Sequence, residues 1–129
     1  MRLLIDTHIW IFMADRPKAL GRKTSRLLAS NATEIWLSPL SIAELFTLRQ
    51  FFRTPDQALV WARASLRRHP FKEAATTTEV ALEAGTFDLS TGDPIDRLLV
   101  ATARVMRCPL VTADEDIISA GVVETIPND

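Results

Sequence analysis

The chain has 129 residues, of which 47% are hydrophobic and 24% are charged, the composition of one ordinary globular domain. The single cysteine, Cys108, excludes an internal disulfide, and no Cys/His cluster has the spacing of a zinc site. No stretch approaches about 18 uncharged apolar residues, which excludes a membrane span. Asp6 and His8 interrupt the apolar start, which argues against a signal peptide, so we expect a protein of the reducing cytoplasm.

The net charge is only −1, but it is unevenly distributed. Residues 16–72 carry eleven Lys/Arg and three acids, a net of +8, whereas residues 73–129 carry three Lys/Arg and eleven acids, a net of −8. Such asymmetry indicates a charged partner such as nucleic acid. It is equally compatible with two halves that attract each other or are simply solvated.

Short apolar runs alternate along the chain with helix-start signals, in which a capping residue or Pro opens the helix. In the first half of the chain, these patterns predict a strand over Arg2–Ile5, an apolar run over Ile9–Met13 and a helix from Pro17 to about Ala29. They then predict a strand over Ile35–Leu37, a helix from Pro39 to about Phe52 and a helix from Pro55 to about Arg68. The second half predicts a short strand over Phe71–Ala74, a helix from Thr78 to Gly85, a loop over Leu89–Gly92, a helix from Pro94, a strand over Pro109–Thr112, a helical turn over Asp114–Ser119 and a last strand over Val122–Ile126. This alternation predicts an α/β domain with a parallel sheet and right-handed crossovers.

Four acidic residues lie where such a fold would aim them at one point. Asp6 follows the first strand and Asp114 follows the fourth. Glu44 and Asp96 are expected in the first turns of the helices that begin at Ser38-Pro39 and Asp93-Pro94. Ligands of open parallel sheets bind at the carboxyl ends of the strands, where the strand order reverses. The four acids therefore predict a site for a hard cation, and with it a metal-dependent phosphoryl-transfer enzyme.

Electrostatic repulsion prevents these four carboxylates from converging fully ionised without a counterion. Two carboxylates about 5 Å apart repel by roughly 3 kcal/mol at an effective dielectric of about 20, and four of them make six such pairs. The total, near 20 kcal/mol, exceeds the roughly 5–15 kcal/mol that holds a domain folded. The cluster must therefore keep protons or bind a cation, and Mg²⁺ and Mn²⁺ prefer oxygen ligands.

Four segments resemble the motifs of PIN domains and occur in the order typical of that family: Leu4-Ile5-Asp6-Thr7, Ser41-Ile42-Ala43-Glu44-Leu45, the run from Asp93 to Ala103, and Leu110-Val111-Thr112-Ala113-Asp114. The Asp-Pro-x-Asp-Arg run and the opening Asp-Thr-His-x-Trp are similar to VapC toxins of bacterial toxin–antitoxin pairs. The resemblance implies one PIN domain over residues 1–129, with a sheet of order 3-2-1-4-5 flanked by helices on both faces. It also implies a Mg²⁺- or Mn²⁺-dependent endoribonuclease, often a homodimer, and a VapB-type antitoxin whose tail occupies the groove near the acids.

The resemblance also assigns roles to single residues. The first to fourth acidic metal ligands match Asp6, Glu44, Asp96 and Asp114, and a more variable fifth matches Asp116. Four of these acids also have a plain structural interpretation, namely capping of a helix by Asp6, an exposed helix face for Glu44, a capping box for Asp96 and the start of a short helix for Asp116. Thr7 is expected to hold the first carboxylate. Arg97 is expected to orient the acids or a phosphate, or else to form a surface ion pair.

Substrate contacts are less specific in the sequence. Basic candidates for the RNA backbone are Arg22, Lys23, Arg26, Arg49 and Arg53. The aromatic residues Trp10, Phe46, Phe51 and Phe52 are expected to pack in the core or in a partner groove more than to stack on bases.

Other functions fit the residues less well. A metal-free ribonuclease would need a histidine pair, and only His8 and His69 are present, in unlike contexts. A haloacid-dehalogenase-like phosphatase would need a second acid two residues after Asp6, where His8 stands. A PIN-like module kept only for interaction would normally have lost one of the acids. An RNA-processing nuclease outside toxin–antitoxin systems stays open.

Overall fold

The computed structural model describes all residues from 1 to 129 and contains a single five-stranded sheet. All neighbouring strands are parallel, and the order is β3-β2-β1-β4-β5, which confirms the predicted α/β fold. The strands are β1 (Arg2–Ile5), β2 (Glu34–Leu37), β3 (Lys72–Glu73), β4 (Leu110–Thr112) and β5 (Thr125–Pro127). From β1 the chain builds outwards to β2 and β3, and it then returns to place β4 on the other side of β1. The strand order therefore reverses between β1 and β4.

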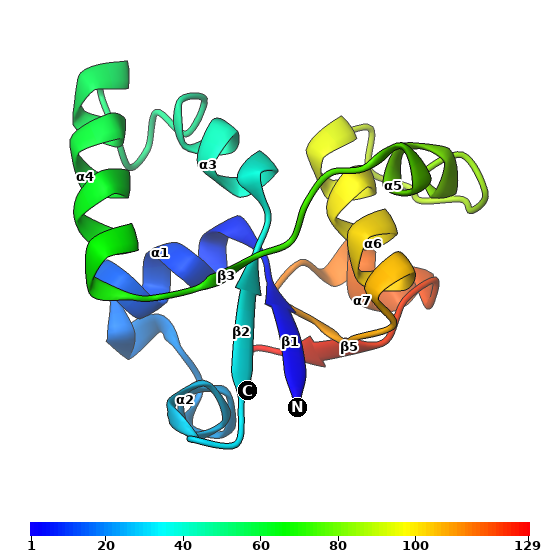
Figure 1. Cartoon of the computed structure of the whole chain (residues 1–129), viewed down its shortest axis with the longest axis horizontal. Helices are drawn as coiled ribbons and strands as arrows, with labels where there is room; N and C mark the ends of the chain where they lie inside the picture. Colours follow the sequence, from blue (N-terminus) through cyan, green and yellow to red (C-terminus); the bar gives the residue numbers. More distant parts are fainter.

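Seven α-helices and one 3₁₀ turn connect the strands: α1 (Thr7–Asp15), η1 (Pro17–Ala19), α2 (Arg22–Ala29), α3 (Pro39–Leu45), α4 (Pro55–Arg68), α5 (Thr78–Glu83), α6 (Pro94–Met106) and α7 (Glu115–Ala120). Six of the α-helices begin at a side chain that accepts a hydrogen bond from a first-turn amide. Five of them, α3 to α7, begin within one residue of a predicted start, whereas α1 was not predicted as a helix. Figure 1 shows α1 to α4 on one side of the central strands and α5 to α7 on the other. None of these helices has the length and apolar character needed to cross a bilayer.

Alternate residues of β1 point into two different cores, as the pleat of a strand requires. Leu3 and Ile5 pack with residues of α1 to α4, whereas Leu4 packs with residues of α6 and α7. The largest fully buried side chain, Trp10, lies in the first core, where its indole nitrogen donates a hydrogen bond to the Ser65 hydroxyl at 2.8 Å. The sheet is thus covered on both faces, and only its edges and strand ends are left for a site.

Several predicted boundaries were wrong. The helix expected from Pro17 to Ala29 is divided at Gly21, where a Cβ would lie 1.8 Å from the backbone carbonyl carbon of Asp129, so the carboxyl-terminal segment requires glycine there. The apolar run from Ile9 to Met13 is part of α1, and the last strand begins only at Thr125.

The helix expected to reach Phe52 ends at Leu45. Beyond it the chain continues in short turns, in which the amide of Phe46 donates to the Ala43 carbonyl and that of Leu48 to the Leu45 carbonyl. Glu44 was predicted in the first turn of this helix, but it lies in the last turn of α3. Its carboxylate still faces the carboxyl edge of the sheet, because α3 is only seven residues long.

Candidate functional site

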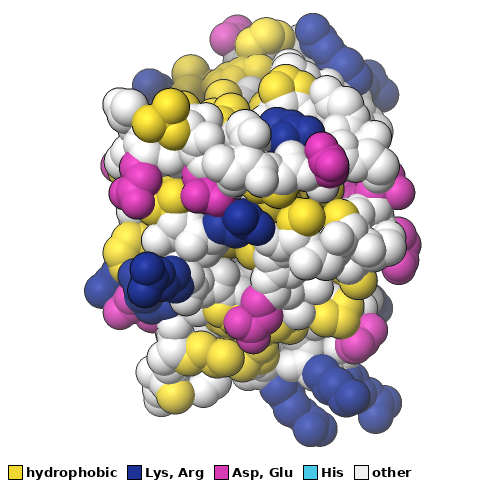
Figure 2. Space-filling view, turned by 90° about the vertical axis from the view of Figure 1, so that its right-hand side faces the viewer, with side chains coloured by type: hydrophobic (Ala, Val, Ile, Leu, Met, Phe, Trp, Pro, Cys, Tyr) yellow, Lys and Arg dark blue, Asp and Glu magenta, His cyan; other side chains and the backbone are white.

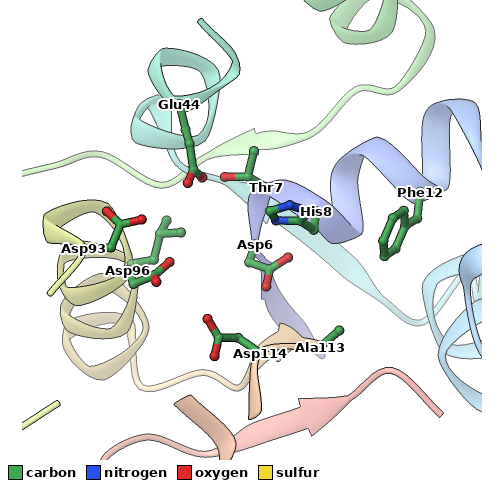
Figure 3. Close-up of a pocket in the computed structure, with 10 residues that line it drawn as sticks. Asp6, Thr7, His8, Phe12, Glu44, Asp93, Asp96, Ala113 and Asp114 are labelled. Carbon is green, nitrogen blue, oxygen red and sulfur yellow. The ribbon is translucent and has the colours of Figure 1, made fainter. Parts of the chain in front are cut away.

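A pocket of about 310 Å³ lies at the carboxyl edge of the sheet, where the strand order reverses. Ten residues line it: Asp6, Thr7, His8, Phe12, Glu44, Asp93, Asp96, Leu99, Ala113 and Asp114. The structure therefore brings together the four acids that the sequence singled out and adds Asp93 to them. Figure 3 shows their carboxylates facing a common space from β1, α3, the start of α6 and the end of β4.

Chain topology explains this convergence. Asp6 directly follows β1, and Asp114 stands two residues after β4, so the two acids lie on either side of the point where the order reverses. The helix α6 runs back towards the start of β4, and its amino terminus with Asp93 and Asp96 therefore lies at the same edge. The tightest group consists of one oxygen each from Glu44, Asp93 and Asp96, which lie within 4.8 Å of one another.

Three of the five carboxylates cap helices and face the pocket at the same time. Asp6 accepts a hydrogen bond from the Ile9 amide, and Asp114 accepts one from the Asp116 amide, both at 2.9 Å and both through Oδ1. Asp93 caps α6 in the same way. Each cap involves one carboxylate oxygen and orients the side chain, which leaves the second oxygen available to a ligand. Capping and ligand binding were weighed as alternatives for Asp6, and the geometry is compatible with both.

The other two carboxylates have almost no partners within the protein. Glu44 is only 8% exposed, and its carboxylate accepts no hydrogen bond. Asp96 meets only the Thr91 hydroxyl, at 3.4 Å. The amide of Asp93 donates to that same hydroxyl, so the capping box considered for Asp96 does not form. Two acids are thus held at the pocket without the internal bonds that would explain their position.

The electrostatics of the pocket favour a proton or a cation. Burial raises the pKa of Asp6, and the Glu44 charge adds to the rise, whereas hydrogen bonds from Thr112 and from the Ile9 amide and the neighbouring His8 ring partly oppose it. Burial also raises the pKa of Asp96 to about 7, and the neighbouring charges of Asp93, Asp114 and Glu44 add to it. No Lys or Arg lines the pocket. A divalent cation would supply the missing positive charge.

Two buried hydroxyls have no hydrogen-bond partner, that of Thr7, which lines the pocket, and that of Ser41 in α3. Figure 3 shows the Thr7 oxygen on the side of its residue that faces Glu44. A buried polar atom without a partner costs free energy, so its position calls for a ligand or water. Thr7 was expected to hold the Asp6 carboxylate, but no hydrogen bond joins the two.

Two residues assigned from the sequence lie elsewhere. Asp116 is exposed and lines a separate hollow with Asp88 and Arg97. The Arg97 guanidinium donates to the carbonyls of Ala84 and Phe87 at 2.7 and 2.9 Å. Arg97 thus fastens α6 to the end of α5, and it neither orients the acids nor forms an ion pair.

The aromatic and histidine residues separate into core and pocket positions. Trp10 and Phe52 are buried in the first core. His69 stacks on Phe71 and lines a different pocket from His8, which leaves no histidine pair for a metal-free mechanism. His8 and Phe12 line the acidic pocket, and sequence reasoning missed both; their spacing of four residues after a strand-end acid was the available signal.

Comparison with known proteins agrees with this architecture. The fold is similar to a chain of VapBC2 from Rickettsia felis bound to a promoter DNA fragment, with a TM-score of 0.75 and 18% identity over 100% of both chains. VapBC from Salmonella typhimurium, bound to DNA, gives 0.73 and 14% over 100% of this chain and 99% of that one. VapC20 from Mycobacterium tuberculosis, a sarcin–ricin loop cleaving toxin, gives 0.68 and 21% over 97% of this chain and 99% of that one.

At these identities the three structures demonstrate a shared fold. No curated protein matches the sequence. The family model described as PIN domain, however, matches residues 3–122, which include β2, β3, β4, all but the first residue of β1 and all five acids of the pocket. The chain belongs to the PIN domain family.

Proposed function

We propose that this protein is a Mg²⁺- or Mn²⁺-dependent endoribonuclease that acts as the toxin of a VapBC-type toxin–antitoxin pair. The observation that carries the proposal is the convergence of five carboxylates, without a Lys or Arg, in one pocket of a PIN fold. VapC20, which has a similar fold, is a toxin that cleaves the sarcin–ricin loop, and this supports RNA as the substrate.

The residues of the pocket fit a hard divalent cation. Its donors are carboxylate oxygens, which Mg²⁺ and Mn²⁺ prefer. Burial raises the pKa of Asp6 and Asp96, and no Lys or Arg lines the pocket to offset the rise. We propose that the cation is held by carboxylates from this set: Asp6, Glu44, Asp93, Asp96 and Asp114. Asp116, outside the pocket, is not part of the set.

A bound divalent cation polarises a phosphodiester, lowers the pKa of an attacking water and stabilises the leaving oxygen. The chain itself contributes orientation. The capping bonds of Asp6 and Asp114 hold these carboxylates in place before any ligand arrives, so little reorganisation is needed. The negative charge of the pocket carboxylates repels a bare phosphate, which makes binding of substrate dependent on the cation. The free hydroxyl of Thr7 can hold a water molecule beside Glu44.

The proposal extends to partners. The similar chains come from VapBC complexes, and we propose a VapB-type antitoxin for this chain as well, with the toxin itself a homodimer. Native co-purification with a small protein encoded beside this one tests the first part, and light scattering of the isolated chain tests the second. Repeated purification without any such companion would contradict the toxin assignment.

Cleavage of RNA by the chain freed of any partner tests the activity. We expect cleavage with Mg²⁺ or Mn²⁺, none with EDTA, and a loss of at least about a hundredfold in Asp6→Asn and Asp96→Asn. Asp56→Asn is the matched control, because Asp56 is an exposed first-turn acid of α4 outside the pocket. Mapping the new ends in total cellular RNA after induced expression identifies the target. Undiminished cleavage by both pocket variants would refute the proposed enzyme.

A further inference from the structure

Building on the proposed function, we propose that His8 and Phe12, supported by Phe51 and Arg16, form a subsite that stacks one base of single-stranded RNA beside the acidic pocket. This subsite gives the enzyme a contact with the base next to the reacting phosphate, in addition to the contact with the phosphate itself.

The positions of these residues on α1 carry the first part of the argument. His8, Phe12 and Arg16 follow one another at intervals of four residues and therefore lie on one side of the helix, with Arg16 at its carboxyl-terminal cap. His8 and Phe12 line the same pocket as the acids. Figure 3 shows the two rings one after the other, leading away from Asp6 along α1. A surface of aromatic side chains thus extends from the carboxylates along α1.

The rings form one connected cluster. His8 meets Phe12 edge-to-face with centroids 6.3 Å apart, and it meets Phe51 in the same manner at 5.8 Å. The Arg16 guanidinium lies 4.9 Å from the centre of the Phe51 ring. Phe51 therefore joins the turn after α3 to the exposed side of α1. Such a cluster offers rigid aromatic surface at low entropic cost to a ligand.

Burial distinguishes these rings from the core aromatics. Trp10 and Phe52 are buried, whereas His8, Phe12 and Phe51 are each partly exposed. Phe12 and Phe51 pack against the first core without being enclosed by it. Partly exposed rings at the rim of a phosphate-reacting pocket have surface left for a base, and stacking tolerates any base because each has a π-face.

Charge favours a polyanion as the occupant. Arg16 is exposed beside Phe51, and Arg49 and Arg53, also exposed, flank Phe51 in the sequence. These cations lie in the segment whose net charge is +8. On the face that Figure 2 shows, basic and acidic side chains are interspersed. RNA combines stacking bases with phosphates for the arginines, which an apolar protein segment does not.

Base-specific fluorescence tests the subsite independently of cleavage. We would bind short single-stranded oligoribonucleotides in Ca²⁺, with 2-aminopurine placed at successive positions. A stacked 2-aminopurine is quenched, so the parent should quench at one or two positions only. Phe12→Leu keeps the apolar contact with the core but removes the ring. We expect it to lose this quenching and to bind roughly tenfold more weakly.

Phe87→Leu is the matched control. Phe87 is also partly exposed, packs against a core and lies near two guanidinium groups, those of Arg97 and Arg104, but it is outside the pocket. It should bind and quench like the parent. If Phe12→Leu proves unfolded by circular dichroism, His8→Leu replaces it, because His8 contributes a ring at the rim of the pocket.

Two results would overturn the subsite: equal quenching in Phe12→Leu and the parent, or quenching that does not depend on the position of 2-aminopurine in the oligonucleotide. Quenching without such dependence is also expected if these rings dock a protein segment. A parent that cleaves RNA with Mg²⁺ while showing either result keeps the proposed function and loses only the subsite. A parent that never cleaves yet quenches at one position retains the base contact and loses the proposed enzyme.

Discussion

Carboxylates occur in this protein in two contrasting environments. Glu34 and Glu83, at the protein surface, each accept a hydrogen bond from a cationic side chain at 3.0 Å, from Lys72 and Arg104 respectively. Hydrogen bonds lower the pKa of both, from Lys72 and Trp36 for Glu34 and from Thr86 and Arg104 for Glu83. Asp6 and Asp96, in the pocket, accept no hydrogen bond from a Lys or Arg side chain, and burial raises the pKa of both.

The difference separates what stabilises the chain from what prepares it for a ligand. A carboxylate whose pKa is lowered is better placed in the folded state than in the unfolded chain, whereas one whose pKa is raised is worse placed. The pocket is therefore a locally unfavourable arrangement that the rest of the fold maintains, as is common where function requires it. A cation bound by the folded state alone would reverse that cost.

Removal of one pocket carboxylate should have the largest effect on the contrast between pocket and surface carboxylates. Asp96→Asn keeps the shape of the side chain but removes a charge that burial and three neighbouring acids oppose. We expect RNA cleavage to fall at least about a hundredfold, while the metal-free variant gains about 1–2 kcal/mol of unfolding free energy at pH 8. Urea unfolding together with the cleavage assay measures both. A variant that loses activity because it is less stable than the parent would contradict this account.

Supplying an internal cation should make the pocket resemble the surface pairs. Ala113 is exposed and lines the pocket, so a lysine there can reach the carboxylates from solvent. We expect Ala113→Lys to weaken Mn²⁺ binding by at least about tenfold, because an ammonium and a divalent cation compete for the same oxygens. Titration calorimetry measures the affinity, and Ala113→Gln controls for size. Equal weakening in the two variants would mean that the effect is steric.

The pH dependence of metal-free stability should reveal the same contrast. The folded-state pKa of Asp96, about 7, exceeds the ordinary value of 3.8, so the folded state holds more protons between these values. Unfolding free energy should therefore fall as the pH rises from about 4 to about 7, by roughly 1–2 kcal/mol, and Asp6 acts in the same direction. Saturating Mg²⁺ at pH 7 to 8 should restore it. Asp96→Asn should flatten the curve; an unchanged slope would assign it to other groups.

Mutation of a surface ion pair should have the smallest effect on stability, and its sign should be opposite to that of a mutation in the pocket. Glu34 has a lowered pKa, so its contribution to stability is lost as the pH falls through the acidic range below about 4.5. Glu34→Gln should lower the melting temperature at neutral pH slightly, by less than Asp96→Asn raises it, because both partners of the pair are largely exposed. Mn²⁺ affinity should be unchanged. A marked loss of metal binding would show that the two environments are coupled.

The sequence was sufficient for the fold and for the convergence of four acids. Asp6 and Asp114 end parallel strands, and strands of one sheet present their carboxyl ends at one edge, so their proximity follows from topology alone. Glu44 was predicted at the correct edge of the sheet, although its predicted position in the helix was wrong. The helix α3 ends after seven residues and is followed by a series of turns, which no local sequence signal predicts.

The residues that sequence reasoning missed depend on tertiary contacts. Asp93 has the sequence pattern of an N-cap, and this pattern does not indicate that its carboxylate also lies beside those of Glu44 and Asp96. Arg97 binds carbonyl groups 10 and 13 residues before it, whose availability depends on how α5 ends. Phe12 and Phe51 come from different elements that only the folded chain brings to His8.

Metal binding by the isolated, partner-free chain tests the central claim most directly. Mn²⁺ titration at pH 8, followed by calorimetry or by electron paramagnetic resonance, compares the parent with Asp6→Asn and with the surface control Glu34→Gln. We predict saturable binding to the parent and to Glu34→Gln, and affinity at least about tenfold lower in Asp6→Asn. Absence of saturable binding to the parent, or equal binding to all three proteins, would contradict the proposal that these carboxylates assemble a cation site.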